Sequence, residues 1–292
     1  MLNIAAAFEH HALSEVEQAD IRRDGYVVVR GALSDRVVED LRSIAFARDS
    51  HYRAAPEVGR HHVLNEHDLV GDEPAWFELI DNPTVFAKVV AIMGWNIQLF
   101  HTQLLVTPPA PDGAQPGPYG WHQDNNRMNR DLDTALHPMV SLKVGYFLTP
   151  LRTTGMGNLC VVPGSHVYAR PSNAVGDGWR GSAGWPHEQP PEWIEVLAEA
   201  GDAVIFDRRL WHSASTNTSS TTRVFVTYGY SYRWLRPKSS MDPAKLPATD
   251  DPLRRQLLGW ATGANGYYDP TALDVPLREW MREHLDDADV PR

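Results

Sequence analysis

The segment GWHQDNN (120–126) places a histidine and an aspartate two residues apart, at His122 and Asp124. In an extended strand, residues i and i+2 point to the same face, so these two side chains can converge on one point. A second imidazole, His212, follows a buried strand in GDAVIFDRRLWHSAS (201–215). Two histidines and one carboxylate form a facial triad, which binds Fe(II) and leaves positions on the metal open. The three residues therefore predict an iron site with room for a co-substrate and oxygen.

Arg223 lies eleven residues after His212, at the head of the alternating strand TRVFVTYGYSY (222–232). Its face of the strand continues with an apolar ring and two small residues, a mixture that suits the inside of a barrel: Phe225, Thr227 and Gly229. A buried arginine needs a partner. Because the planar guanidinium matches a carboxylate with two parallel hydrogen bonds, we expect Arg223 to bind a dicarboxylate co-substrate.

The elements that position these residues are mainly strands. From Asn96 the hydrophobic period changes from 3.6 towards 2, and short apolar or alternating segments predict strands at 96–106, 141–148, 158–164, 202–207 and 222–232. Short strands separated by Gly and Pro favour a closed or double-sheet β architecture. Before them the chain reads as helix, strand and helix, with the β-branched run GYVVVRG (25–31) as the strand, and Ser34 is expected to cap the second helix. Helical patterns return after the last strand.

We therefore expect a single domain over residues 1–292 with helices around a β core. The expected parts are an N-terminal helical buttress at about 1–95, a β-barrel core at about 96–235 and a C-terminal helical tail at about 236–292. Residues 169–193 are rich in Gly, Pro and Trp and show no periodicity, which is typical of a lid over a site.

Composition limits the partners and the setting. The formal net charge of −10 argues against nucleic-acid binding and does not favour anionic membranes. No apolar run reaches the ~18 residues of a membrane span, and the N-terminus lacks the pattern of a secretory signal. The one cysteine, Cys160, predicts a reducing, cytoplasmic setting and supplies too few thiolates for a structural zinc site. A small-molecule substrate is expected, and the sequence makes no prediction of the oligomeric state.

In combination, these motifs resemble the Fe(II)- and 2-oxoglutarate-dependent oxygenases of the phytanoyl-CoA dioxygenase type. The order and spacing of His122, Asp124, His212 and Arg223 carry the resemblance. Other similar segments are DGYVVVRGAL near the start, WHQD, GNLCVVPGSH (157–166) and YRWLRP (232–237). The similarity runs from about residue 20 to about residue 240, and most of the chain is therefore covered.

The resemblance implies a mainly β fold with flanking helices, whose core is a double-stranded β-helix (a cupin-like jelly roll). It implies that the triad binds Fe(II), and that Arg223 holds the distal carboxylate of 2-oxoglutarate while the keto-acid end chelates the metal and O₂ takes the last position. His101, Gln103 and Tyr119 match positions that reach or pack on the co-substrate in similar proteins. The expected reaction is hydroxylation of a small organic molecule, in specialised metabolism, with release of succinate and CO₂.

Two positions refine this expectation. Related halogenating enzymes carry a small residue where this chain has Asp124, so the carboxylate favours oxygenation. The family often has a hydroxyl residue two positions after the distal histidine, whereas this chain has Ala214 between Ser213 and Ser215. Which hydroxyl assists Arg223 is therefore open.

Other interpretations also stay open. A cupin-like metalloenzyme, such as an isomerase or a dioxygenase that does not use 2-oxoglutarate, can use a similar triad but does not need Arg223. A ligand-binding β domain without catalysis needs neither. Desaturation, epimerisation and cyclisation share one hydrogen abstraction with hydroxylation, and the sequence does not separate them. The substrate itself is not predicted, and its candidate contacts follow the His-x-Asp motif or lie in the expected lid: Asn125, Arg127, Trp179 and Trp185.

Overall fold

The structure is a computed structural model that describes residues 11–124, 126–132, 134, 137–167, 192–240 and 244–285. Its strands are β1 (Tyr26–Val29), β2 (Leu64–His67), β3 (Ile97–Thr107), β4 (Pro118–His122), β5 (Ser141–Phe147), β6 (Leu159–Val161), β7 (Ile194–Glu195), β8 (Ala203–Asp207), β9 (His212–Ser215) and β10 (Arg223–Tyr232). They form two antiparallel sheets, one of six strands in the order β1-β8-β5-β10-β3-β2 and one of four in the order β4-β9-β6-β7.

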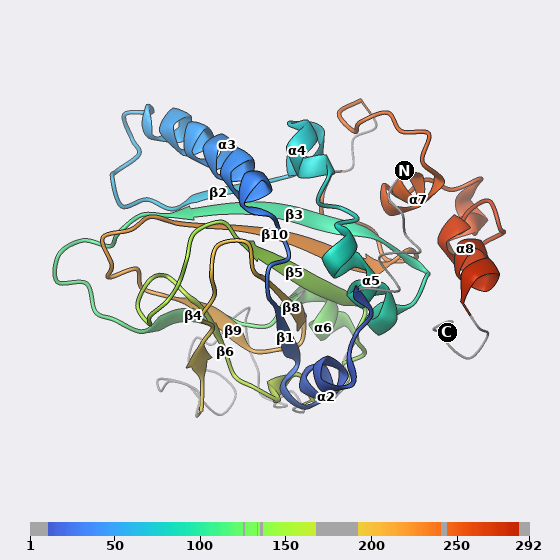
Figure 1. The fold of residues 1–292 in the computed structure, drawn as a ribbon, viewed down its shortest axis with the longest axis horizontal. Coiled ribbons are helices and arrows are strands. Elements are labelled where there is room, and N and C mark those ends of the chain that lie inside the picture. The colour runs from blue at the N-terminus through green and yellow to red at the C-terminus, as the bar shows by residue number, and fades with distance from the viewer. Residues whose placement is uncertain are drawn as a thin grey trace.

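The helices are α2 (Glu15–Asp24), α3 (Asp35–Arg53), α4 (Pro74–Phe77), α5 (Pro83–Met93), α6 (Asn126–Leu132), α7 (Pro252–Leu257) and α8 (Pro276–His284), with short 3-10 turns η1 (Leu69–Gly71), η2 (Ser165–Val167) and η3 (Ala264–Tyr267). Figure 1 shows α3 and α4 on one side of the six-stranded sheet and β4, β6 and β9 on the other. The expected cap is present, because the Ser34 side chain accepts a hydrogen bond from the backbone N–H of Val37.

The central strand β10 pairs with both β3 and β5, and its alternation separates two cores. Val224, Val226, Tyr228 and Tyr230 pack into the main core with apolar residues of α3, α4 and α5. On the other face, Phe225 packs with Leu159 and Val161 of β6 in a second core between the sheets. Period-two alternation therefore places one face of β10 under the helices and the other between the sheets, as expected for a strand with both faces buried.

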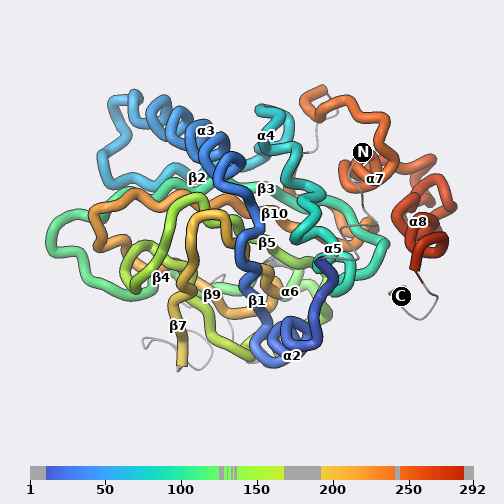
Figure 2. The backbone as a smooth tube through the Cα atoms, viewed as in Figure 1, coloured from blue at the N-terminus to red at the C-terminus, as the bar shows by residue number. Residues whose placement is uncertain are grey.

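The expected mainly β, cupin-like fold with flanking helices is confirmed, with two differences in detail. The strands form two facing sheets rather than one closed barrel. The N-terminal segment contains, besides β1 in the β-branched run at 25–31, the unexpected strand β2; β1 pairs with β8 and β2 pairs with β3 in the larger sheet. Figure 2 shows α7 and α8 at the end of the molecule away from β4 and β7. Among the described residues, no helix has the length and apolar character needed to cross a membrane.

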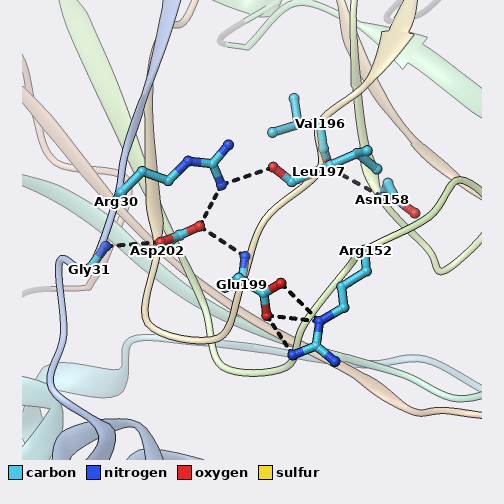
Figure 3. A network of polar contacts seen from close by, with 8 residues as sticks. All are labelled: Arg30, Gly31, Arg152, Asn158, Val196, Leu197, Glu199 and Asp202. Carbon is cyan, nitrogen blue, oxygen red and sulfur yellow. Dashed lines mark hydrogen bonds and ion pairs between the residues drawn. The ribbon is translucent and has the colours of Figure 1, made fainter.

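A buried aspartate ties several of these elements together at the edge of the sheets (Figure 3). Asp202, just before β8, accepts hydrogen bonds from the backbone N–H groups of Gly31 and Glu199 and from the guanidinium of Arg30, at 2.9, 2.9 and 2.6 Å. Glu199 in turn pairs with Arg152 at 2.8 Å. The network therefore connects the end of β1 to the segment after β7 and fixes the start of β8.

Candidate metal centre

The triad is built on the pairing of two short strands. His122 ends β4, His212 begins β9, and the two are register partners in the smaller sheet. The ladder is irregular between Tyr119 and His122, and the two imidazole rings have centroids 4.2 Å apart. Asp124 lies two residues beyond His122, where its backbone N–H donates to the carbonyl oxygen of Arg208 at 2.9 Å. The structure therefore brings together all three residues expected to bind the metal.

The geometry suits a metal bound through the two Nε2 atoms and one carboxylate oxygen. Asp124 Oδ1 lies 4.0 Å from His122 Nε2 and 3.8 Å from His212 Nε2, and the three ligand atoms all lie within 4.8 Å of one another. Metal–ligand bonds of about 2.0–2.2 Å place adjacent ligands about 3 Å apart, so these side chains need to close by roughly 1 Å. In each ring Nδ1 lies 2.8 Å from a backbone carbonyl oxygen, that of Gly120 or of Leu210. Donation from Nδ1 leaves the Nε2 lone pair for a metal.

The charge states fit the same role. Burial lowers the pKa of His212 to about 3 and also lowers that of His122, so both imidazoles are neutral near pH 7. Burial alone would raise the pKa of Asp124, but the Lys143 ammonium and the two imidazoles hold it well below its usual range. Two neutral imidazoles and one carboxylate are the donor set of a mononuclear Fe(II) centre with open positions.

Two further residues hold Asp124. Lys143 Nζ lies 2.6 Å from Asp124 Oδ2. The Arg208 guanidinium donates to the Asp124 carbonyl oxygen at 3.4 Å and to Asn129 Oδ1 at 2.7 Å, which joins the triad to helix α6. The sequence leaves the facing of Lys143 undecided, and Arg208 was not singled out. In the sequence, Arg208 is the first of two adjacent arginines and lies four residues before His212. No neighbouring residue indicates its role.

Arg223 is a buried cation that lacks an acidic partner among the described residues. It is 4% exposed, and its guanidinium carbon lies 4.5 Å from the centroid of the Phe225 ring. Its Nε has no hydrogen-bond partner. Burial lowers its pKa to about 10, which leaves it charged at neutral pH, and the nearby Tyr119 hydroxyl acts in the opposite direction. A charged, buried and unpaired guanidinium fits a carboxylate ligand.

The other expected co-substrate residues differ in their surroundings. His101 is 6% exposed, and a Cβ at Gly229 would lie 2.3 Å from its Nδ1, so the ring occupies the space that this glycine leaves. Burial and then Lys143 lower the pKa of His101 to about 3, which places it beside the charges of the centre. Gln103 instead donates to Asn65 Oδ1 of β2 at 2.8 Å. Tyr119 is half exposed and lies near Arg223.

Three hydroxyl groups are candidates for assisting Arg223, those of Ser213, Ser215 and Thr227. Ser213 donates to the carbonyl oxygen of Tyr119. The hydroxyl oxygens of Ser215 and Thr227 are buried without a hydrogen-bond partner, and Thr227 shares the face of β10 that carries Arg223 and Phe225. The substrate candidates Asn125, Trp179 and Trp185 lie outside the described residues, as does the side chain of Arg127.

The fold, the triad and the unpaired arginine define an iron- and 2-oxoglutarate-dependent dioxygenase as the class of protein. The family model of phytanoyl-CoA dioxygenase (PhyH) matches residues 21–225, and the chain belongs to this family, as its motifs predicted.

Two relatives match this chain over most of its length. An uncharacterized protein of Mycobacterium tuberculosis, Rv1501, is 24% identical over 278 residues, which cover 89% of this chain and 92% of the relative. Dioxygenase af480 of Aspergillus fumigatus is 24% identical over 257 residues, which cover 84% of this chain and 76% of that protein.

Solved structures share the fold at low sequence identity. The non-haem alpha-ketoglutarate-dependent carbocyclase SnoK from nogalamycin biosynthesis superposes with a TM-score of 0.61 at 21% identity, over 83% of this chain and 94% of that chain. The epimerase SnoN, in complex with Fe3+, alpha-ketoglutarate and nogalamycin RO, gives 0.57 at 22% identity over 84% and 97%. HygX from Streptomyces hygroscopicus, with nickel and 2-oxoglutarate bound, gives 0.56 at 18% identity over 78% and 88%.

Proposed function

We propose that the protein hydroxylates a small organic molecule with Fe(II), 2-oxoglutarate and O₂, releasing succinate and CO₂. The observation that carries this proposal is the buried guanidinium of Arg223, which has no acidic partner among the described residues, in a fold that also assembles the His122, Asp124 and His212 triad. A cupin-like enzyme that does not use 2-oxoglutarate has no need of that arginine. A ligand-binding domain without catalysis has no need of the triad.

The proposed roles follow from the surroundings of each group. The two Nε2 atoms and Asp124 Oδ1 hold Fe(II), and Arg223 binds the distal carboxylate of 2-oxoglutarate. Tyr119 packs beside that carboxylate, and Thr227, whose hydroxyl is unpaired, is the hydroxyl that assists in place of Ala214. Bound iron and 2-oxoglutarate supply the oxidation chemistry, while the protein orients them and excludes water.

The substrate class is proposed from the relatives. SnoN was solved with nogalamycin RO and HygX with hygromycin B, so we place the substrate among the small molecules of specialised metabolism. Asn125, Arg127, Trp179 and Trp185 remain its proposed contacts. The buried free thiol of Cys160 supports a reducing, cytoplasmic setting. The sharing of one sheet by strands from residues 26 to 232 supports a single oxygenase domain.

The test is to bind Fe(II) and 2-oxoglutarate without oxygen and to record the visible charge-transfer absorption of the chelate. We expect Arg223→Leu to weaken 2-oxoglutarate binding roughly 100-fold, because a charge-assisted bidentate pair is lost from a buried site. Iron content should stay unchanged. Arg152→Leu is the matched control, because it removes an exposed arginine from the distant Glu199 pair. If Arg223→Leu binds 2-oxoglutarate as tightly as the wild type, the role assigned to Arg223 is wrong.

A further inference from the structure

The carboxylate of Asp124 is held asymmetrically. Oδ1 is the oxygen that lies 3.8 and 4.0 Å from the two imidazole Nε2 atoms. Oδ2 points elsewhere and lies 2.6 Å from Lys143 Nζ. Both side chains are largely buried, with 15% of Asp124 and 10% of Lys143 exposed. One oxygen of the carboxylate therefore faces the centre, while the other is occupied by a cation.

The larger sheet places Lys143 beside Asp124 Oδ2. Lys143 lies on β5 between Phe206 of β8 and Gly229 of β10, and its Nζ lies 5.6 Å from the centroid of the Phe206 ring. Gly229 has no side chain, and the His101 ring of β3 occupies the space that it leaves. Asp124 is the acidic partner of Lys143 among the described residues. A buried ammonium is costly unless it is paired, so this lysine is placed for the carboxylate.

We infer that Lys143 is a positioning residue that keeps Asp124 a one-oxygen ligand of the iron. This inference rests on the proposed function and adds a residue to it. A six-coordinate ion with three protein ligands has three positions left, two for 2-oxoglutarate and one for oxygen. A carboxylate that bound through both oxygens would take a fourth position and leave too few. The hydrogen bond from Lys143 to Oδ2 prevents this.

The positive charge of Lys143 also affects the affinity of the site for a metal ion. An ammonium on the far side of the carboxylate repels a divalent cation and stabilises the metal-free state through its ion pair with Asp124. Removal of the lysine should therefore not weaken metal binding, although it should disturb the open positions. A residue that merely stabilised the fold would leave both properties unchanged once its folding was accounted for.

The experiment titrates Co(II) into metal-free protein by calorimetry, then adds 2-oxoglutarate and follows the Co(II) visible spectrum. For Lys143→Met we expect Co(II) to bind as tightly as in the wild type or more tightly. The Co(II) form should then bind 2-oxoglutarate at least about tenfold more weakly, with a changed spectrum, as expected for loss of a group that orients a metal ligand.

Lys143→Gln separates the hydrogen bond from the charge, because the amide still donates to Oδ2. We expect it to bind Co(II) at least as tightly as the wild type and 2-oxoglutarate within about threefold of it. Weaker Co(II) binding by this variant overturns the inference. If Lys143→Met does not fold, Lys143→Gln alone tests the inference.

The matched control is Lys88→Met, which removes another buried lysine from an ion pair, 2.8 Å from Glu17 and outside the centre. It should lower stability and leave both titrations unchanged. Lys143→Met that behaves like Lys88→Met, or that no longer binds Co(II), overturns the inference. If the wild type itself binds neither Co(II) nor 2-oxoglutarate, the proposed function fails instead, so the two failures are distinguishable.

Discussion

At the scale of single residues, the metal centre combines neutral imidazoles with a carboxylate that stays charged. The imidazoles are neutral because burial disfavours the protonated ring, and this lowers the pKa of His212 to about 3. Asp124 stays ionised because the nearby Lys143 ammonium outweighs its burial. The site is therefore in its metal-binding protonation state before any metal arrives, and protons compete with the metal only at low pH.

This protonation state predicts a weaker pH dependence of metal binding than ordinary histidines give. We expect the affinity of the metal-free protein for Co(II), measured by calorimetry in matched buffers, to fall only slightly as the pH passes through about 6.5. Histidines with the ordinary pKa of about 6.5 would instead lose up to about tenfold in affinity per pH unit and per ring below that value. A steep fall that begins near pH 6.5 would contradict the burial argument.

The residues of the site differ in how far the sequence could predict them. The convergence of His122 and Asp124 was predicted from extended-strand geometry, although β4 ends at His122 and a backbone hydrogen bond to Arg208 places Asp124. The convergence of His212 was predictable from motif spacing. The facing of Lys143 was not, because every residue of β5 is buried and alternation carries no signal there. Arg208 was missed because its partners, Asn129 and the Asp124 carbonyl, lie about 80 residues away in the chain.

At the scale of elements, the sequence predicts the strands whose own residues carry an apolar or alternating pattern. β3, β5, β8 and β10 were expected from such patterns and form the centre of the larger sheet, and the β-branched run at 25–31 indicated β1. The four-residue strand β2 was not expected, because its sequence LNEH is mostly polar and the pairing that makes it a sheet member comes from β3. Strand β9 is equally short and was read only as the position of His212.

The aspartate before β8 gives a prediction at this scale. Asp202→Ala removes the acceptor of two backbone N–H groups and one guanidinium, as Figure 3 shows. We expect the free energy of unfolding, measured by urea denaturation, to fall by about 1–3 kcal/mol, because buried donors are left unsatisfied. Asp202→Asn, which keeps one carbonyl oxygen as an acceptor, should lose less of this free energy.

Glu199→Gln is the control for the Asp202 prediction. It breaks the exposed pair with Arg152 in the same network, and exposed ion pairs are screened by solvent. A loss as large as that of Asp202→Ala would show that the exposed pair, not the buried aspartate, holds these elements together.

At the scale of the whole molecule, both cores are built from apolar residues, and the polar groups of the candidate site lie beside the core between the sheets. The main core, between the larger sheet and α3, α4 and α5, is apolar and buries Tyr228 and Tyr230 with their hydroxyls bonded to backbone carbonyls. Trp76 Nε1 and the Tyr146 hydroxyl are unpaired in this core, and the space between the sheets contains unpaired polar atoms of Arg223, Thr227 and His101. Unpaired buried polar groups cost stability, and the charged one, Arg223, costs most unless a ligand pairs with it.

That cost is measurable as a loss of stability in acid. His101 and His212 have pKa values of about 3 in the folded protein, below the unfolded value of about 6.5. Between these values the unfolded chain binds more protons than the folded one, so stability is full above about pH 6.5 and is lost as the pH falls toward 3. Each ring contributes up to about 1.4 kcal/mol per pH unit in that window. Asp124 does not account for a loss above about pH 4.5, because its pKa is lowered from an unfolded value near 4.

We therefore expect the melting temperature of the metal-free protein to fall steadily between about pH 6.5 and pH 4.5, when followed by scanning fluorimetry after treatment with a chelator. His101→Asn should flatten this dependence, because it removes one ring that must stay uncharged without removing a metal ligand. The exposed His284 supplies the control, since His284→Asn removes a histidine outside both cores. A melting temperature that is constant over this range in the wild type would mean that His101 and His212 take up protons as readily in the folded protein as in the unfolded chain.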